Sequence, residues 1–129
     1  MQKAEAPIIK ILIVDDSELI GSKIRELLLG IPNLLLLPQV RTANDALKSI
    51  MKNQPDVVIL DFRLLQGNGF DVLKTIKKDL PGIKTIMLTN SSGESYQKKF
   101  KEYGGDIFLD KTKEFSNIAG AVLLLMATS

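Results

Sequence analysis

The apolar and polar positions of this chain alternate in a regular order that predicts strands and helices in turn. Five short runs are almost entirely apolar and stop abruptly in polar residues, which is typical of strands buried on both faces of a parallel sheet. A segment with apolar residues at helical spacing follows each run. The five runs cover residues 8–14, 34–40, 57–61, 83–89 and 107–109.

The segments between the runs carry the start and stop signals of amphipathic helices. Ser17 and the stretch 42–45 are suited to cap helix N-termini, and Gly30 and residues 81–82 are suited to end helices. The residues expected to face the core are Ile20, Ile24, Leu27 and Leu28, then Ala46, Leu47, Ile50 and Met51, then Phe70, Leu73, Ile76 and Leu80, and finally Phe115, Ile118, Val122 and Leu123.

The helix expected between the fourth and fifth runs, which closes at Gly104 and Gly105, differs from the others in its charge. We expect it to be the most loosely held helix, because few of its side chains can be buried. Its lysines at 98, 99 and 101 are interpreted as a solvated face, with contact to an acidic partner as the alternative. Three aromatic side chains are its only apolar ones, namely Tyr96, Phe100 and Tyr103.

Five strand–helix units in succession predict an α/β fold with a parallel sheet, right-handed crossovers and helices on both faces. Pro38 cannot donate to a sheet ladder, so the run 34–40 is expected at an edge. This agrees with the flavodoxin-like strand order 2-1-3-4-5, in which the first and third strands are neighbours. We expect one domain over residues 8–129, preceded by a disordered lead-in over residues 1–7.

Composition narrows the chemistry that the chain can perform. The 129 residues include neither cysteine nor histidine, which excludes disulfides, thiol catalysis, His-based triads and zinc sites built on these residues. The lack of cysteine fits a reducing cytoplasm. With 17 basic and 15 acidic residues, the charge of +2 gives no reason to expect nucleic acid or a membrane as the main partner. No signal peptide is expected, and the apolar tail 119–127 is too short to span a bilayer.

Polar residues with phosphate or metal chemistry end or directly follow four of the five runs. They are Asp15 and Asp16, then Asp61, Thr89 and Lys111. The carboxyl ends of parallel strands meet at one edge of a sheet, so these side chains should converge. Three carboxylates held together repel one another unless a cation is present. An all-oxygen site of this kind suits Mg²⁺, which also accepts phosphate oxygens as ligands.

The same residues could support transfer of a phosphoryl group. A carboxylate such as that of Asp61 can attack phosphorus and form an acyl phosphate. Lys111 and Mg²⁺ could neutralise the charge of the transferring group, and the hydroxyl of Thr89 could hydrogen-bond to it. Each of these residues taken alone has a simpler explanation, such as a helix cap or a solvated charge, so the prediction depends on their joint placement.

In this order and at strand ends, these residues resemble the receiver domain of response regulators in two-component signalling, over essentially the whole chain. The match also includes Gly69, eight residues after Asp61, and Phe108, three residues before Lys111. The resemblance implies that Asp61 is the phosphoacceptor and that Lys111 pairs with the phosphoryl group. The Mg²⁺ ligands that it implies are Asp15, Asp16, Asp61 and the backbone carbonyl of Arg63.

The resemblance also implies a switching function rather than an enzyme, with self-catalysed phosphotransfer and autodephosphorylation only. Thr89 would move toward the phosphoryl group, Phe108 would turn inward with it, and the surface of the last two strands and helices would shift. The donor would be a phosphohistidine of a histidine kinase or a phosphotransfer protein, on another chain because this one has no histidine. The output would be a downstream protein or an effector domain, with phosphorylation-dependent dimerisation left open.

Three positions depart from the usual receiver pattern. Leu65 and Thr112 stand where proline is common, and the isomer of the Lys111–Thr112 bond is left open. Arg63 lies two positions past Asp61, where side chains overhang the phosphoryl group. Our hypothesis is that Arg63 and Asn90 set the rate of dephosphorylation.

Three other functions are weighed against the switch. A degenerate receiver would bind partners without being phosphorylated, but the acidic residues and Lys111 form a complete set. An aspartate-based phosphohydrolase needs a second acid two residues after its nucleophile, where this chain has Arg63. A flavodoxin-like cofactor binder is disfavoured because an acidic pocket repels a flavin phosphate. The motif 67–69 lacks the third glycine of a dinucleotide fingerprint and is interpreted as a turn.

Overall fold

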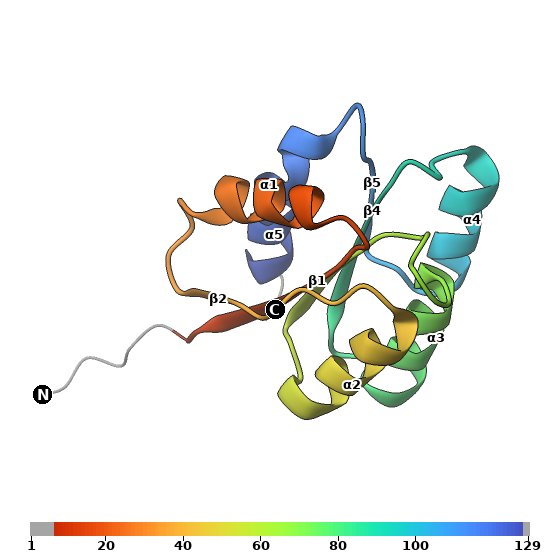
Figure 1. The fold of residues 1–129 in the computed structure, drawn as a ribbon, viewed down its shortest axis with the longest axis horizontal. Coiled ribbons are helices and arrows are strands. Elements are labelled where there is room, and N and C mark those ends of the chain that lie inside the picture. The colour runs from red at the N-terminus through yellow and green to blue at the C-terminus, as the bar shows by residue number, and fades with distance from the viewer. Residues whose placement is uncertain (1–6, 128–129) are drawn as a thin grey trace, which may run out of the picture.

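A computed structural model describes residues 7–127 and places a five-stranded parallel sheet between two layers of helices (Figure 1). The strand order is β2-β1-β3-β4-β5, which confirms the predicted topology. The elements are β1 (Ile9–Val14), α1 (Glu18–Leu28), β2 (Leu34–Leu36), α2 (Ala43–Asn53), β3 (Val57–Leu60), α3 (Gly69–Asp79), β4 (Lys84–Thr89), α4 (Glu94–Glu102), β5 (Ile107–Asp110), the short 3₁₀ helix η1 (Phe115–Asn117) and α5 (Ile118–Ala127).

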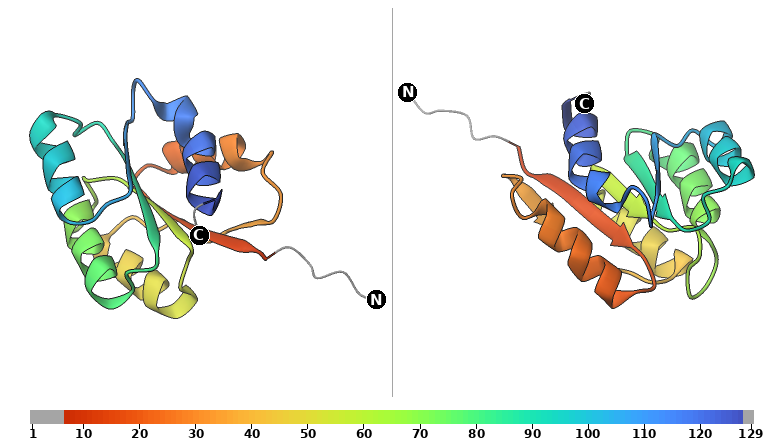
Figure 2. Two further views of the ribbon diagram at one scale, coloured as in Figure 1. Left: turned by 180° about the vertical axis from the view of Figure 1, so that it is seen from behind. Right: turned by 90° about the horizontal axis from the view of Figure 1, so that it is seen from above.

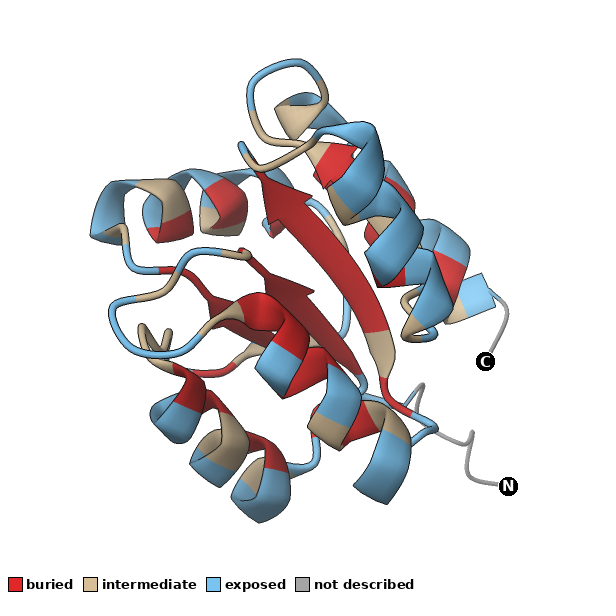
Figure 3. Ribbon diagram, turned by 90° about the vertical axis from the view of Figure 1, so that its right-hand side faces the viewer, coloured by how far each residue is buried: buried red, intermediate tan, exposed pale blue. Residues whose placement is uncertain are grey.

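The two faces of the sheet form separate apolar cores. Leu12 and Val58 belong to the core beneath α2, α3 and α4, whereas Ile13 and Ile59 belong to the core beneath α1 and α5. This alternation is the period of two expected of a strand. Figure 2 shows α1 and α5 together on one side of the sheet, and Figure 3 shows that the strands are buried almost throughout.

Side-chain caps begin three of the helices. The side-chain oxygens of Ser17 and Thr42 accept hydrogen bonds from the backbone N–H groups three residues later, at 3.2 and 3.0 Å, as predicted for these positions. Asn68 caps α3 in the same way, at 3.0 Å from the nitrogen of Asp71. Gly67 before it has a φ of 71°, so the predicted turn at 67–69 is confirmed.

The second strand is shorter than predicted. It covers Leu34–Leu36 rather than residues 34–40, because Pro38 has no N–H to continue the regular ladder. The N–H groups of Leu37 and Val40 still donate to backbone carbonyls of β1, so the segment continues to follow β1. The predicted edge position of this strand is confirmed.

Three residues predicted to face the core are exposed instead. They are Leu27, Met51 and Leu123, which are 37%, 55% and 50% exposed. On α5, residues at helical spacing pack on the sheet and leave Leu123 outside; these residues are Ile118, Ala121, Val122 and Leu125. An apolar sequence without charges does not mark which side of a helix is buried, and for this reason the prediction for Leu123 was wrong.

Within residues 7–127, no helix is both long enough and apolar enough to cross a membrane. Apart from the exposed Pro7, the lead-in predicted over residues 1–7 lies outside the described part of the chain.

Candidate functional site

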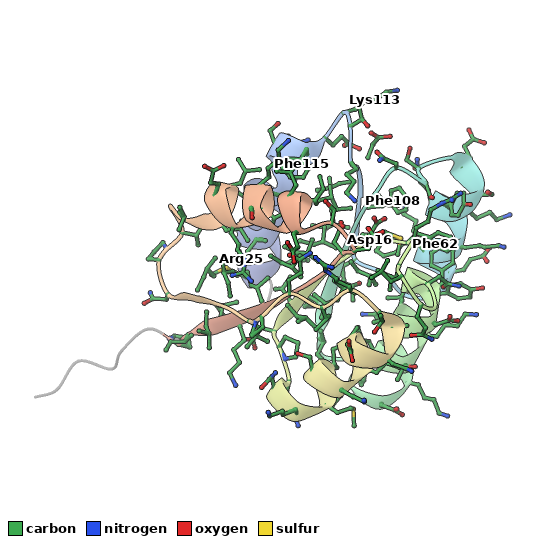
Figure 4. All side chains as sticks on the ribbon, in the orientation of Figure 1. Asp16, Arg25, Phe62, Phe108, Lys113 and Phe115 are labelled. Carbon is green, nitrogen blue, oxygen red and sulfur yellow. The ribbon has the colours of Figure 1, made fainter. Side chains whose placement is uncertain are left out.

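The predicted site residues other than Phe108 meet at the carboxyl edge of the sheet. Val14 of β1 is paired with Leu60 of β3, so the residues that follow them, Asp15 and Asp61, lie next to each other. Figure 4 labels Asp16 at this edge. A cleft of about 400 Å³ opens there, and its lining includes six of the predicted residues, namely Asp16, Asp61, Arg63, Thr89, Asn90 and Lys111.

Lys111 joins the two buried carboxylates. Its Nζ lies 2.8 Å from Oδ2 of Asp15 and 2.8 Å from Oδ2 of Asp61. The other oxygen of each carboxylate accepts a backbone N–H, from Ser17 at 2.9 Å and from Phe62 at 2.7 Å. Both carboxylates are therefore held in fixed orientations by the start of the loop that follows each strand.

Burial and charge act against each other at this ion pair. Burial has the largest effect on Asp15 and raises the pKa of its carboxyl above the ordinary value, although the hydrogen bonds from Lys111 and Ser17 act to lower it. Burial alone would lower the pKa of Lys111, but its hydrogen bonds to Asp15 and Asp61 raise this pKa above 10.5. Lys111 is thus a firmly charged ammonium group at neutral pH.

The acidic residues have the chemistry of a magnesium site. One oxygen from each of Asp15, Asp16 and Asp61 lies within 4.8 Å of the others, and Asp16 is exposed at the mouth of the cleft. Lys111 balances only one of the three negative charges, so the site favours a further cation. Three carboxylate oxygens would fill only part of the octahedral coordination of Mg²⁺, and the remaining coordination positions could take water or phosphate oxygens.

The two predicted switch residues occupy different surroundings. Thr89 is fully buried at the end of β4, and its Oγ1 accepts the N–H of Ser91 at 3.1 Å. Phe108 is outside the cleft lining and packs edge-to-face on Phe100 of α4, with ring centroids 5.5 Å apart. Thr89 therefore faces the site, whereas Phe108 lies against the helix layer of α4.

The loops that lack the usual prolines are held by hydrogen bonds that proline could not make. The N–H of Leu65 donates to the carbonyl of Arg41 at 3.0 Å. The N–H of Thr112 donates to Asp110 at 2.9 Å, and its hydroxyl donates to Asn90 at 3.0 Å. The Lys111–Thr112 bond is trans, since no cis bond occurs in residues 7–127.

Asp110 anchors the loop that carries Lys111, a role that the sequence analysis missed. Its carboxylate accepts the Ser92 hydroxyl and the backbone N–H groups of Thr112 and Lys113. The hydrogen bond from Ser92 is the main cause of a lowered pKa at Asp110. This carboxylate therefore connects the loop after β4 with the loop after β5.

Gln39 is a second positioning residue that the sequence analysis missed. Its side-chain N–H group donates to the carbonyls of Asp15 at 2.8 Å and Ser17 at 2.9 Å, so it clamps the loop that presents the acidic pair. A Cβ at Gly21 of α1 would collide with the amide oxygen of Gln39. A glycine inside a helix is unfavourable, and Gly21 was the one sequence signal of this contact.

This contact predicts a change of sign in a double-mutant cycle. Alone, Gly21→Ala is expected to lower the free energy of unfolding by about 1 kcal/mol, because loss of the clamp outweighs the gain in helix propensity. In the Gln39→Ala background the collision is gone, so the same substitution should raise stability by about 0.5–1 kcal/mol. Urea unfolding of the four proteins measures both effects. An effect of the same sign in both backgrounds would contradict the clamp.

Comparisons with known proteins identify the family of this chain. Residues 11–123 match the response regulator receiver domain. The chain belongs to this family. Over 114 residues this receiver domain is 31% identical to the response regulator protein VraR of Staphylococcus epidermidis, covering 88% of this chain and 54% of VraR. Over 105 residues it is 32% identical to a protein-glutamate methylesterase/protein-glutamine glutaminase of Pyrococcus horikoshii, covering 80% of this chain and 28% of that protein.

Solved structures show the same receiver fold. A LuxR-family response regulator from Aurantimonas superimposes with a TM-score of 0.86 at 20% identity, over 94% of this chain and 86% of that chain. The non-phosphorylated HemR receiver domain of Leptospira biflexa gives a TM-score of 0.75 at 27% identity, over 93% and 92%. The present chain spans about half the length of VraR, so the activities of whole regulators do not transfer to it.

Proposed function

We propose that this receiver domain is a phosphorylation-controlled switch in which Asp61 accepts a phosphoryl group. The observation that carries the proposal is the ion pair between Lys111 and Asp61, at a cleft edge where a carboxylate oxygen of Asp61 lies within 4.8 Å of those of Asp15 and Asp16. The donor is a phosphohistidine on a histidine kinase or a phosphotransfer protein. We place the exchange in the cytoplasm, which the cysteine-free sequence favours.

In the proposed transfer, an oxygen of Asp61 forms a bond to phosphorus while the bond between phosphorus and the donor nitrogen breaks. Lys111 moves from the Asp61 carboxylate to a phosphoryl oxygen, and its raised pKa keeps it charged. The Thr89 hydroxyl donates to another phosphoryl oxygen. Asp15, Asp16, Asp61 and the Arg63 carbonyl would hold Mg²⁺, which supplies charge neutralisation on the phosphoryl oxygens when it is bound.

Intact-mass measurement tests the proposed acceptor. After incubation with Mg²⁺ and phosphoramidate, the wild-type chain should gain one phosphoryl group and Asp61→Asn none, because an amide is not a nucleophile at neutral pH. Asp79→Asn is the matched control, since this exposed carboxylate at the end of α3 lies outside the cleft. Absence of an adduct on the wild type would favour the degenerate receiver. An unchanged adduct on Asp61→Asn would place the acceptor elsewhere.

We also propose that Arg63 and Asn90 set the lifetime of the acyl phosphate. Both side chains line the cleft with Asp61, and Asn90 is bonded to Thr112. Arg63→Ala and Asn90→Ala should each change the rate at which the adduct is lost, because both residues control access of water to phosphorus. Mass spectra recorded over time after removal of the donor measure this rate. Unchanged lifetimes in both variants would contradict the proposal.

The proposed output is a shift of the surface formed by β4, α4, β5 and α5. Thr89 ends β4, which is paired with β5, and Phe108 of β5 packs on Phe100 of α4. Movement of Thr89 toward a phosphoryl group would therefore be passed through β5 to α4. The reader of this surface would be a downstream protein, an effector domain or a second copy of the chain.

A further inference from the structure

A second cleft lies between α3 and α4, beside the proposed phosphorylation site. Its volume is about 410 Å³, within the range of binding pockets. We name it the α3–α4 cleft. The lining residues that define it here are Phe62, Phe70, Lys74, Tyr96, Lys99 and Tyr103.

Aromatic rings form the apolar part of the α3–α4 cleft. Phe62 contacts Phe70 and Tyr96 edge-to-face, with ring centroids 4.8 and 4.9 Å apart. Phe70 and Tyr103 make a similar contact at 5.4 Å. Figure 4 labels Phe62 on the α4 side of the site. Phe62, Tyr96 and Tyr103 are only partly buried, so they offer ring surface to a ligand.

The polar groups of the cleft have few partners of their own. Within residues 7–127, Lys74 and Lys99 form no ion pair, and neither tyrosine hydroxyl forms a hydrogen bond. Lys74 lies over the ring of Tyr103, 4.5 Å from its centroid. Asp71 is the one acidic residue in the lining, so the two lysines leave the cleft with a net positive charge.

We propose that the α3–α4 cleft docks an acidic peptide segment of a partner protein. One aromatic or aliphatic side chain of the segment packs on the partly exposed ring surfaces of Phe62 and Tyr96. Carboxylates on either side of it pair with Lys74 and Lys99. Buried apolar anchors with charged groups at the rim are the usual arrangement of a protein interface. Charge complementarity selects an acidic partner over a basic one.

The location of the cleft connects it to the proposed switch. Phe62 contributes its ring to the cleft, and its N–H donates to Asp61 at 2.7 Å. Docking itself requires no phosphoryl group. Any change of affinity on phosphorylation rests on the proposed function, so docking is tested first on the unphosphorylated chain and on Asp61→Asn.

The test is a titration of ¹⁵N-labelled chain with blocked pentapeptides of the form Asp-Glu-X-Glu-Asp, where X is Phe, Leu or Trp. We expect saturable shifts at the amides of the cleft residues, equal in wild type and Asp61→Asn. Lys99→Glu should weaken binding roughly fivefold or more. Lys98→Glu is the matched control, because Lys98 has the same charge on the same helix but does not line the cleft.

Two results would overturn the proposal. The first is the absence of saturable shifts at the cleft with all three peptides. The second is equal weakening by Lys98→Glu and Lys99→Glu, which would show attraction to the basic helix in general. Both lysines are exposed, so neither substitution should prevent folding.

Discussion

Replacing Lys111 with methionine is expected to lower the free energy of unfolding by about 3–5 kcal/mol at pH 7. The side chains of Lys111, Asp15 and Asp61 are at most 10% exposed, so solvent screens their interaction weakly. Removing the ammonium group leaves two buried carboxylates facing each other without a counter-charge. Methionine keeps most of the side-chain volume, so the loss is one of charge rather than of packing.

Urea unfolding of the two proteins measures this difference. Lys113→Met is the control, since Lys113 is exposed in the same loop and forms no ion pair within the described residues. Added Mg²⁺ should stabilise Lys111→Met more than wild type, because the cation binds a more negative site in the folded state. Equal losses at positions 111 and 113 would contradict the assigned ion pair.

The contribution of Lys111 to the free energy of unfolding should fall as the pH becomes strongly alkaline. The pKa of Lys111 is raised in the folded chain, so its contribution is fully present below 10.5 and is lost as the pH rises through the folded value. Between pH 10.5 and the raised folded pKa, the side chain of Lys111 loses its proton in the unfolded chain but keeps it in the folded chain. On the alkaline side, the difference in free energy of unfolding between wild type and Lys111→Met should therefore begin to narrow only above pH 10.5.

The strand order and most site residues could be predicted because, in a parallel sheet, the place of a residue along its strand determines the edge of the sheet at which it lies. A residue that ends or directly follows a strand must lie at the carboxyl edge, and this applies to Asp15, Asp61 and Thr89 whatever their distance in sequence. The resemblance to receivers then gave each residue a chemical role. The residue roles and the lead-in over residues 1–7 remain predictions.

Other features could not be predicted because they depend on distances between loops. Gln39 was unremarkable in sequence, yet its side chain crosses to the loop after β1. Asp110 looked like a strand-end residue, and its bond to Ser92 connects two loops 18 residues apart. The side on which α5 packs was equally hidden, because an apolar residue such as Leu123 is allowed on either side.

Gly69→Ala is expected to lower the free energy of unfolding by about 1–3 kcal/mol and to slow phosphorylation of Asp61. A Cβ at Gly69 would collide with the carbonyl oxygen of Asp61. It would also lie 2.9 Å from Cε of Met87 and 3.1 Å from Cα of Phe62. Two of these three atoms are backbone, so relief of the collision must displace the end of β3.

Gly120→Ala is the matched control for Gly69→Ala, because it makes the same substitution at a helical glycine with open space around it. Gly120 is exposed on α5 with open space where a Cβ would lie, so alanine should raise stability by about 0.5–1 kcal/mol through helix propensity. Urea unfolding and the rate of adduct formation with phosphoramidate measure both variants. A stability gain at both glycines would contradict the crowding at Gly69. Loss of stability with an unchanged adduct rate would show that Asp61 tolerates a displaced strand end, and the rigidity of β3 would then not be required for the proposed phosphotransfer.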